Sequence, residues 1–95
     1  GKRIIVVGVA YKANIADLRE TPAEILIGEL RRLGASVSWH DPLVGQWKGE
    51  KSCELAAADI AIVVTKHDVI SVEAIMNSAP YVFDTTGAVY GAHRP

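Results

Sequence analysis

The sequence lacks the features that mark disulfide-rich and membrane-spanning chains. Its 95 residues include a single cysteine, Cys53, so an internal disulfide is excluded, and no second metal ligand stands at a suitable spacing beside it. We expect Cys53 to be a small apolar core residue rather than a nucleophile, in a reducing, cytoplasmic compartment. The longest apolar run, Ile60 to Val64, is far too short to cross a bilayer, so we expect no membrane partner.

An excess of charge of one sign is also lacking. Ten Lys and Arg residues against 11 Asp and Glu residues give a formal net charge of −1, and the basic residues form no stripe. We therefore expect no nucleic-acid partner. With 49% hydrophobic and 22% charged residues, the chain has the composition of one soluble domain with a core of its own. Because it begins Gly-Lys-Arg directly before a strand-like run, we expect it to be a piece of a longer polypeptide.

Glycine-rich phosphate loops are missing as well. A dinucleotide fingerprint needs G-x-G-x-x-G directly after the first strand, whereas Gly8 is followed by VAYK and the next glycine is Gly28. A P-loop is absent for the same reason. An anionic ligand at this position would have to be held by side chains instead of by a glycine turn.

What is present is an alternation of strand and helix patterns. Apolar segments predict strands at 3–7, 37–39, 60–64 and 81–83. Helices are predicted from Thr21, at about 52–58 and at about 71–77, and the tail 87–95 is expected to be loosely held. With right-handed crossovers this pattern gives an α/β, Rossmann-like three-layer sandwich. Its four-stranded parallel sheet would have the order 2-1-3-4 and helices on both faces.

The helix that begins at Thr21 carries the clearest local signals. Thr21, Pro22 and Glu24 predict a capping box, in which Thr21 accepts from the Glu24 amide and the Glu24 carboxylate reaches back. Gly34 supplies a left-handed end. Residues spaced three and four apart predict the buried stripe: Ala23, Leu26, Ile27, Leu30 and Leu33.

A long loop separates the first strand from this helix. It covers residues 8–20, more than the usual connection of about 2–6 residues. The strand order 2-1-3-4 places this loop beside residues 65–68, over one crevice at the carboxyl ends of the strands. Open α/β sheets bind their ligands at that edge.

The loop carries two cations and an aromatic ring at this edge. Lys12 and Arg19 suit a phosphate, the guanidinium as a bidentate donor and the ammonium as a point charge, with Tyr11 beside them. An equally good interpretation pairs Arg19 with Asp17 or Glu20 and leaves Lys12 solvated. Residue chemistry alone leaves both open.

The run GVAYKANIADLRETPA, followed by a helix and a strand that ends in HDP, resembles the C-terminal domain of the UDP-glucose/GDP-mannose dehydrogenase family. The later Thr65-x-His67 also fits the family pattern. The resemblance covers nearly the whole chain. It implies an NAD-dependent nucleotide-sugar 6-dehydrogenase that oxidises a UDP- or GDP-linked sugar to the uronic acid, for instance in polysaccharide biosynthesis.

The same resemblance implies a division of labour between domains. Residues 1–95 would be the single UDP-binding domain of a three-domain enzyme. An N-terminal NAD-binding domain and a helical middle domain, with the cysteine nucleophile and a dimer contact, would complete it. We therefore expect a homo-oligomeric full-length enzyme and an inactive isolated domain. The alternative from a different class is a stand-alone Rossmann-like nucleotide-binding or regulatory module without catalysis.

By resemblance, Tyr11 and Lys12 would bind the nucleotide-sugar substrate and Arg19 would reach toward NAD, with no catalytic or metal-binding residue in the chain. Asp17 would orient Arg19 or simply cap the turn. One departure concerns the last strand, where relatives continue with Asp-x-Arg but this chain has Asp84-Thr85-Thr86. Either Arg94 or another domain compensates, or the substrate differs, or this corner binds nothing.

Two histidines and two tryptophans remain. His67 could donate to a phosphate or to the uracil edge, but pairing with Asp68 or a backbone group is favoured, and His40 is expected to be structural. Trp39 and Trp47 could stack on a base, although burial against the sheet is the usual role of large aromatics.

Overall fold

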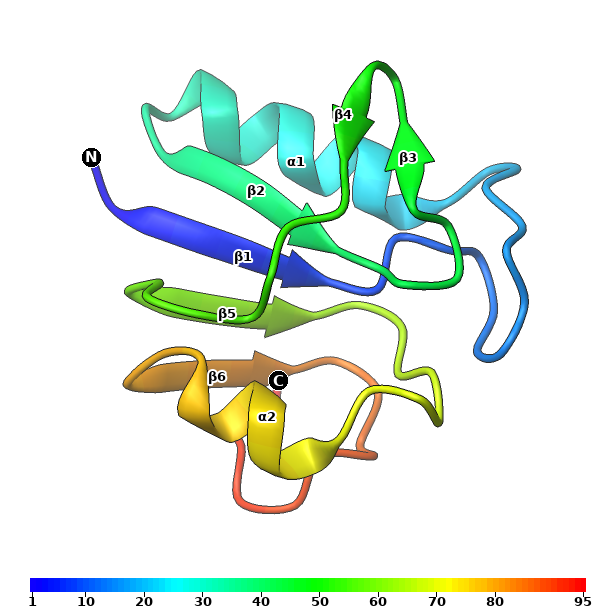
Figure 1. Ribbon diagram of the computed structural model, residues 1–95. Helices are drawn as coiled ribbons and strands as arrows, with labels where there is room; N and C mark the ends of the chain where they lie inside the picture. The colour runs from blue at the N-terminus through cyan, green and yellow to red at the C-terminus, as the bar shows by residue number, and fades with distance from the viewer.

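The computed structural model describes residues 1–95 and contains a main sheet of four parallel strands. The strands are β1 (Arg3–Val7), β2 (Ser36–His40), β5 (Ile60–Val63) and β6 (Tyr81–Asp84), in the order β2-β1-β5-β6 (Figure 1). This is the predicted order 2-1-3-4. The helices are α1 (Pro22–Arg32) and α2 (Val72–Asn77). Neither helix combines the length and the apolar character needed to cross a membrane.

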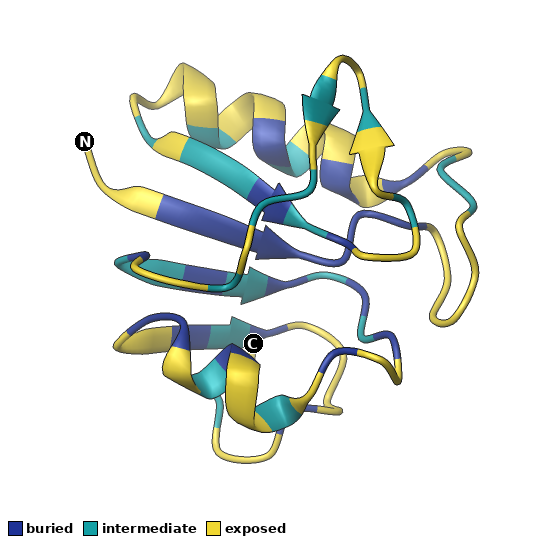
Figure 2. Ribbon diagram, in the orientation of Figure 1, coloured by how far each residue is buried: buried dark blue, intermediate teal, exposed yellow.

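The core lies on both faces of the sheet, as a doubly covered parallel sheet requires. Alternate residues of β1 face opposite sides: Val6 packs with Ile27 of α1 and Trp39, whereas Ile5 and Val7 belong to a second cluster with Ile75 of α2. Figure 2 shows burial along nearly the whole of β1. The two clusters confirm the three-layer α/β architecture, and they hold the strand ends that carry the loops in fixed positions.

The start and end of α1 follow the predicted signals only in part. Thr21 caps the helix, but its hydroxyl accepts from the backbone N–H of Ala23 at 3.3 Å, not from that of Glu24. The Glu24 carboxylate does not reach back, because it forms an ion pair with Lys48 at 2.8 Å. Leu33 was expected in the buried stripe and is instead 71% exposed, because it is the C-cap residue, beyond the last helical turn.

The predicted helix at 52–58 is wrong. A hairpin of β3 (Gln46–Trp47) and β4 (Glu50–Lys51) lies before it, and the chain then continues to β5 without a helix. The hairpin turns at Lys48 and Gly49, whose φ values are +52° and +77°, as two-residue turns of this kind require.

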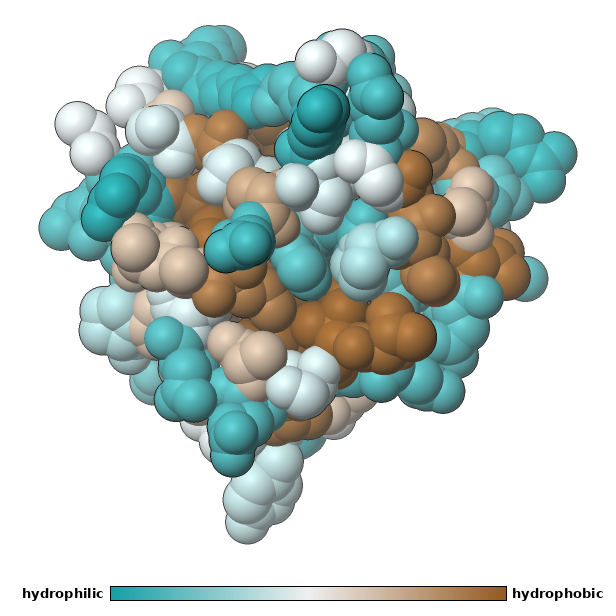
Figure 3. Space-filling model, in the orientation of Figure 1, coloured by the Kyte–Doolittle hydropathy of each residue, from teal (hydrophilic) through white to brown (hydrophobic).

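Tertiary hydrogen bonds explain why residues 52–58 do not form a helix. The Ser52 hydroxyl accepts from the backbone N–H of Asp41 at 2.8 Å instead of capping a helix. The Cys53 N–H donates to the carbonyl of Trp39, also at 2.8 Å. The segment therefore follows the end of β2, and Figure 3 shows apolar side chains gathered between the hairpin and α2 on the face in view.

The tail is held more firmly than predicted. His93 bridges to β6, since its N–H donates to the Val82 carbonyl at 2.9 Å and its carbonyl accepts from the Asp84 N–H at 2.7 Å. Its ring stacks on Tyr81 with 4.2 Å between centroids, and Val89 is fully buried. The expectation of a loosely held end is therefore wrong, because the tail adds hydrogen bonds and a core residue to the sheet.

Candidate functional site

Two loops lie side by side at the carboxyl edge of the sheet, as predicted. They are the loop from β1 to α1 and the loop from β5 to α2 (Figure 1). The Thr65 hydroxyl donates to the carbonyl of Ala10 at 2.6 Å. The Asn14 amide donates to Asp68 at 3.2 Å, and its oxygen accepts from the Asp68 N–H at 2.7 Å. These bonds join the two loops into one surface.

The first loop leaves β1 through a close backbone contact at Gly8. This glycine has a φ of +79°, and a Cβ placed on it would stand 1.9 Å from the carbonyl oxygen of Thr65. Its N–H donates to the carbonyl of His40 at 2.8 Å. Glycine is needed here for the approach of neighbouring strand ends and for the positive φ, not for a phosphate turn.

A buried carboxylate, Asp41, fixes the base of the same loop. Its Oδ2 accepts from the backbone N–H groups of Val9 at 2.9 Å and Ala10 at 3.2 Å. Its Oδ1 accepts from the N–H groups of Leu43 and Val44, both at 3.1 Å. The side chain has no exposed surface, so these bonds replace the water that the charge has lost.

His67 completes this buried cluster. Its Nε2 lies 2.9 Å from Oδ2 of Asp41, and its Nδ1 accepts from the backbone N–H of Asn14 at 2.7 Å. Because Nδ1 is an acceptor, the proton is on Nε2, and a neutral imidazole donates to Asp41. The expected backbone partner is confirmed, but pairing with Asp68 is wrong, and His67 is fully buried, so it cannot reach a ligand.

Four main-chain amides of the loop are consequently occupied. Those of Val9 and Ala10 donate to Asp41, that of Asn14 to His67, and that of Tyr11 to the carbonyl of Asp17 at 2.6 Å. A phosphate at the end of β1 therefore finds no free backbone donor among these four. This agrees with the missing glycine fingerprint.

The predicted ligand-binding side chains are at the exposed part of the loop. Tyr11 is 51% exposed, and Lys12 and Arg19 are also exposed. Arg19 donates to Asp17 from Nε at 3.1 Å and from Nη2 at 2.8 Å. The alternative interpretation, in which Arg19 pairs within the loop, is therefore confirmed. The hydrogen bonds and charge of Arg19 lower the pKa of Asp17 to about 2. The guanidinium edge that carries Nη1 is left for another partner.

Two hollows meet at Tyr11. One, of about 260 Å³, lies at the ends of the strands, and its lining residues are Tyr11, Ala13, Val64, Thr65, Lys66, Thr86 and Ala88. The other, of about 650 Å³, is lined by Tyr11, Asp17, Arg19 and Glu20. Lys12 lines neither. Sequence reasoning did not select Lys66, although its place directly after a strand at this edge marks it; its ammonium donates to the His67 carbonyl at 2.8 Å.

Thr86, at the position where the resemblance led us to expect an arginine, is hydrogen-bonded within its own turn. Its hydroxyl donates to Oδ1 of Asp84 at 2.6 Å, and its N–H donates to the same oxygen at 2.8 Å. Burial alone would raise the pKa of Asp84, but these hydrogen bonds and that from Val89 outweigh it and lower the pKa. Arg94 lies on the tail, 3.4 Å from the carbonyl of Gly87, and lines neither hollow, so it does not compensate at this corner. Lys66 is the cation that lines the same hollow as Thr86.

The remaining candidates lie away from the carboxyl edge. The His40 ring lies 2.6 Å from the Cys53 carbonyl, and Cys53 packs partly buried against the core. Trp39 is 1% exposed and meets Trp47 edge to face with 6.0 Å between ring centroids. None of these residues reaches the carboxyl edge hollows.

The fold and this edge define a Rossmann-like domain with two hollows at the carboxyl ends of its strands. Residues 5–91 match the family model described as the UDP-glucose/GDP-mannose dehydrogenase family, UDP binding domain. The chain belongs to this family, as the resemblance implied.

Relatives of established function carry the same domain. The chain is 35% identical over 71 residues to a UDP-N-acetyl-D-mannosamine dehydrogenase of Methanococcus maripaludis, a match that covers 70% of this chain and 16% of that protein. It is 35% identical over 78 residues to the UDP-glucose 6-dehydrogenase AglM of Haloferax volcanii, covering 72% and 18%. The chain thus spans less than a fifth of the length of these relatives.

Solved structures agree on the fold. The UDP-N-acetyl-mannosamine dehydrogenase Cap5O of Staphylococcus aureus superposes with a TM-score of 0.76 at 22% identity, covering 98% of this chain and 24% of that chain. The NDP-N-acetyl-D-galactosaminuronic acid dehydrogenase of Methanosarcina mazei gives 0.78 at 23% identity, covering 92% and 21%.

Proposed function

We propose that this chain is the nucleotide-sugar-binding domain of an NAD-dependent nucleotide-sugar 6-dehydrogenase, which oxidises a UDP- or GDP-linked sugar to the uronic acid. Membership of the family and the dehydrogenase names of the relatives support the class of enzyme. The chain spans 16% and 18% of two of them, which leaves room for the NAD-binding and helical domains that the reaction needs.

The observation that carries the proposal is the contrast between occupied amides and exposed cations. The backbone N–H groups of Val9 and Ala10 donate to the buried Asp41 carboxylate. The side chains of Lys12 and Arg19 stand exposed on the same loop. A diphosphate at this edge is therefore held by side-chain donors, and Lys12 is the point charge that meets it.

Tyr11 lies where the two hollows of the carboxyl edge meet. It lines both the hollow at the strand ends and the wider hollow beside Arg19. In our proposal the nucleotide sugar lies against Tyr11 and Lys12, and the wider hollow opens toward the cofactor.

Arg19 fits an anionic cofactor such as NAD. Its side chain is 88% exposed, and Asp17 accepts from its Nε and Nη2 only. The other edge is therefore oriented and available for a phosphate of the cofactor. NAD itself supplies the hydride acceptor, and this chain contributes binding and orientation.

Calorimetry on the full-length protein tests the role of Lys12. We expect Lys12→Ala to weaken binding of the UDP-sugar by about tenfold, the loss of one charge-assisted bond. The matched control is Lys51→Ala, because Lys51 is also exposed but lies on the β3–β4 hairpin, outside the two loops of the carboxyl edge. Unchanged affinity in Lys12→Ala would remove this residue from the site. A panel of UDP- and GDP-sugars, read by NADH absorbance, tests the reaction itself.

A further inference from the structure

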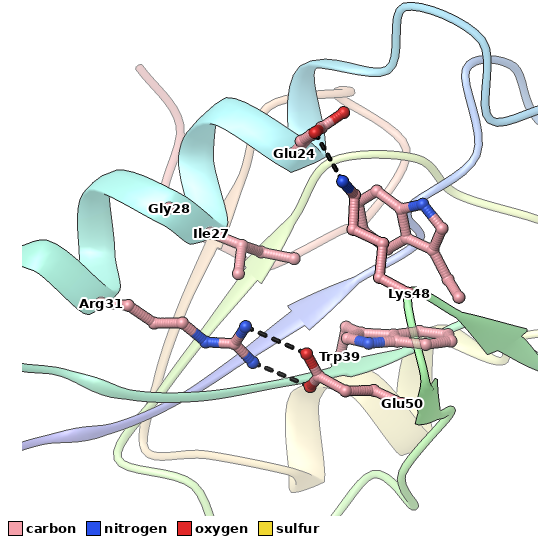
Figure 4. Close-up of a pocket in the computed structure, with 8 residues that line it drawn as sticks. Glu24, Ile27, Gly28, Arg31, Trp39, Lys48 and Glu50 are labelled. Carbon is pink, nitrogen blue, oxygen red and sulfur yellow. Dashed lines mark hydrogen bonds and ion pairs between the residues drawn. The ribbon is translucent and has the colours of Figure 1, made fainter.

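A third hollow lies away from the carboxyl edge, between α1 and the β3–β4 hairpin. It measures about 260 Å³ and is lined by Glu24, Ile27, Gly28, Arg31, Trp39, Trp47, Lys48 and Glu50 (Figure 4). It shares no lining residue with the two hollows around Tyr11. The proposed function makes no use of it.

An unpartnered donor stands at this hollow. The Trp39 side chain is 1% exposed, and its Nε1 is the one buried side-chain nitrogen or oxygen without a hydrogen-bond partner. Buried indole N–H groups normally find an acceptor, because leaving one unpaired is costly. In Figure 4 the nitrogen lies on the edge of the ring turned toward Arg31 and Glu50. Because this nitrogen has almost no accessible surface, an acceptor in the hollow satisfies it only when the side chains that cover it shift to admit the ligand.

Gly28 keeps the hollow open. It lies in the middle of α1, where glycine is less favourable than almost any other residue. No positive φ and no close neighbour requires it, since a Cβ there would meet nothing within 4 Å. Gly28 lines the hollow, so a larger residue at this position would take up part of the space that the glycine leaves free for an occupant.

The charges around the hollow cancel. Lys48 pairs with Glu24 at 2.8 Å, and Arg31 pairs with Glu50 through two bonds of 2.8 and 3.0 Å, as the dashed lines in Figure 4 show. Two cations and two carboxylates leave no excess of either sign. A charged ligand would have to break a pair, whereas an uncharged one would leave both intact.

From these features we infer that the hollow between α1 and the hairpin is a second ligand site, which takes a small, uncharged ring compound bearing a hydrogen-bond acceptor. The ring lies against Trp39, Trp47 and Ile27, and the acceptor takes the indole N–H of Trp39. The volume of about 260 Å³ has room for a single ring.

The test uses benzamide, benzoate and toluene as probes on the 95-residue chain labelled with ¹⁵N. A Trp47→Phe variant assigns the two indole N–H signals, and the spectrum itself reports that the chain is folded. We expect benzamide to shift the Trp39 indole proton saturably. Benzoate should bind at least about fivefold more weakly because its charge must be desolvated between closed ion pairs. Toluene, which has no acceptor, should leave the indole proton near its original position.

Two variants make the assignment specific. Gly28→Leu should abolish the benzamide shift by filling the hollow, while the control Ile25→Leu, exposed on the same helix and outside the lining, should preserve it. Trp39→Phe should reduce benzamide binding to the level of toluene. The proposal is overturned if benzamide causes no saturable shift, which would mean that water alone meets the indole, or if Gly28→Leu binds it unchanged.

Discussion

Nε2 of His67 donates a hydrogen bond of 2.9 Å to Oδ2 of Asp41, and neither side chain has any exposed surface. The two residues follow different strands, β2 and β5, and through Val9, Ala10 and Asn14 they also hold the loop after β1. One buried cluster thus fixes three segments of the carboxyl edge. The exposed side chains of the loop thus stand on a hydrogen-bonded base.

The first prediction concerns the Asp41 carboxylate. Both of its oxygens accept from N–H groups, so an asparagine in either orientation would turn an NH₂ group toward at least two donors. We expect Asp41→Asn to lower the free energy of unfolding by about 2–4 kcal/mol, the cost of leaving buried donors unpaired. Urea denaturation followed by circular dichroism measures it.

Asp59→Asn is the control for that experiment. Asp59 also accepts from a backbone N–H, that of Arg3 at 2.8 Å, but at an exposed position. Water can replace that bond, so the change should cost less than about 1 kcal/mol. If Asp41→Asn and Asp59→Asn lowered the free energy of unfolding equally, burial of the Asp41 carboxylate would not add to the strength of its hydrogen bonds.

A second prediction concerns the titration of Asp17 and its contribution to stability at low pH. Arg19 lowers the pKa of Asp17 from its ordinary value of 3.8 to about 2. The folded state therefore holds this carboxylate charged where the unfolded chain would protonate it, and the stabilisation is fully present above pH 3.8. It is lost as the pH falls through about 2. Carbon-13 NMR titration of the Asp17 carboxyl group should give its midpoint near this lower value.

Removing the Arg19 guanidinium tests whether it is the cause of the low pKa of Asp17. In Arg19→Ala the Asp17 midpoint should return toward 3.8, because the carboxylate loses the guanidinium and keeps only the hydrogen bond from the backbone N–H of residue 19. Arg94→Ala, a distant exposed change, should leave the titration unchanged. A low midpoint that survives Arg19→Ala would contradict the assignment.

A third prediction separates the two cations of the loop by kinetics. In the full-length enzyme, Arg19→Ala should raise the KM for NAD or lower kcat by about tenfold, with the UDP-sugar affinity little changed. The control is Arg32→Ala, whose guanidinium pairs with Glu29 on α1, away from both hollows at the carboxyl edge. Normal kinetics for both ligands in Arg19→Ala would exclude it from the site.

The fold could be read from the sequence where local signals and burial agree. Apolar strands, the Thr21 cap and the left-handed Gly34, with φ of +94°, were all confirmed. The helix at 52–58 failed because Ser52 resembles a helix cap locally, whereas in the fold its hydroxyl meets the Asp41 N–H at the end of β2. Such bonds between distant segments leave no trace in a local pattern.

The candidate site was likewise predictable from the sequence only in part. Tyr11, Lys12 and Arg19 could be chosen by residue type and by their place after a strand, and the structure shows them exposed on the loop. The contact between Asp41 and His67 could not be predicted in this way. The two residues are 26 apart in the sequence, and only the order of the strands brings them together. The binding roles of the exposed residues stay predictions.

The last prediction concerns Gly8, where the loop leaves β1. An alanine there would place its Cβ 1.9 Å from the Thr65 carbonyl oxygen and keep a φ of +79°. The backbone of β1 or β5 would have to move, and with it the bond from the Gly8 N–H to His40. We expect Gly8→Ala to destabilise the fold by about 3 kcal/mol or more, measured by urea denaturation.

Gly34→Ala is the matched control for this change. Gly34 also has a positive φ, +94°, but a Cβ there would meet nothing within 4 Å. The alanine would therefore suffer only the strain of the left-handed conformation, about 1–2 kcal/mol. The difference between the two variants isolates the contact with Thr65. If Gly8→Ala cost no more than Gly34→Ala, the close approach of β1 to β5 would not be what requires glycine at the start of this loop.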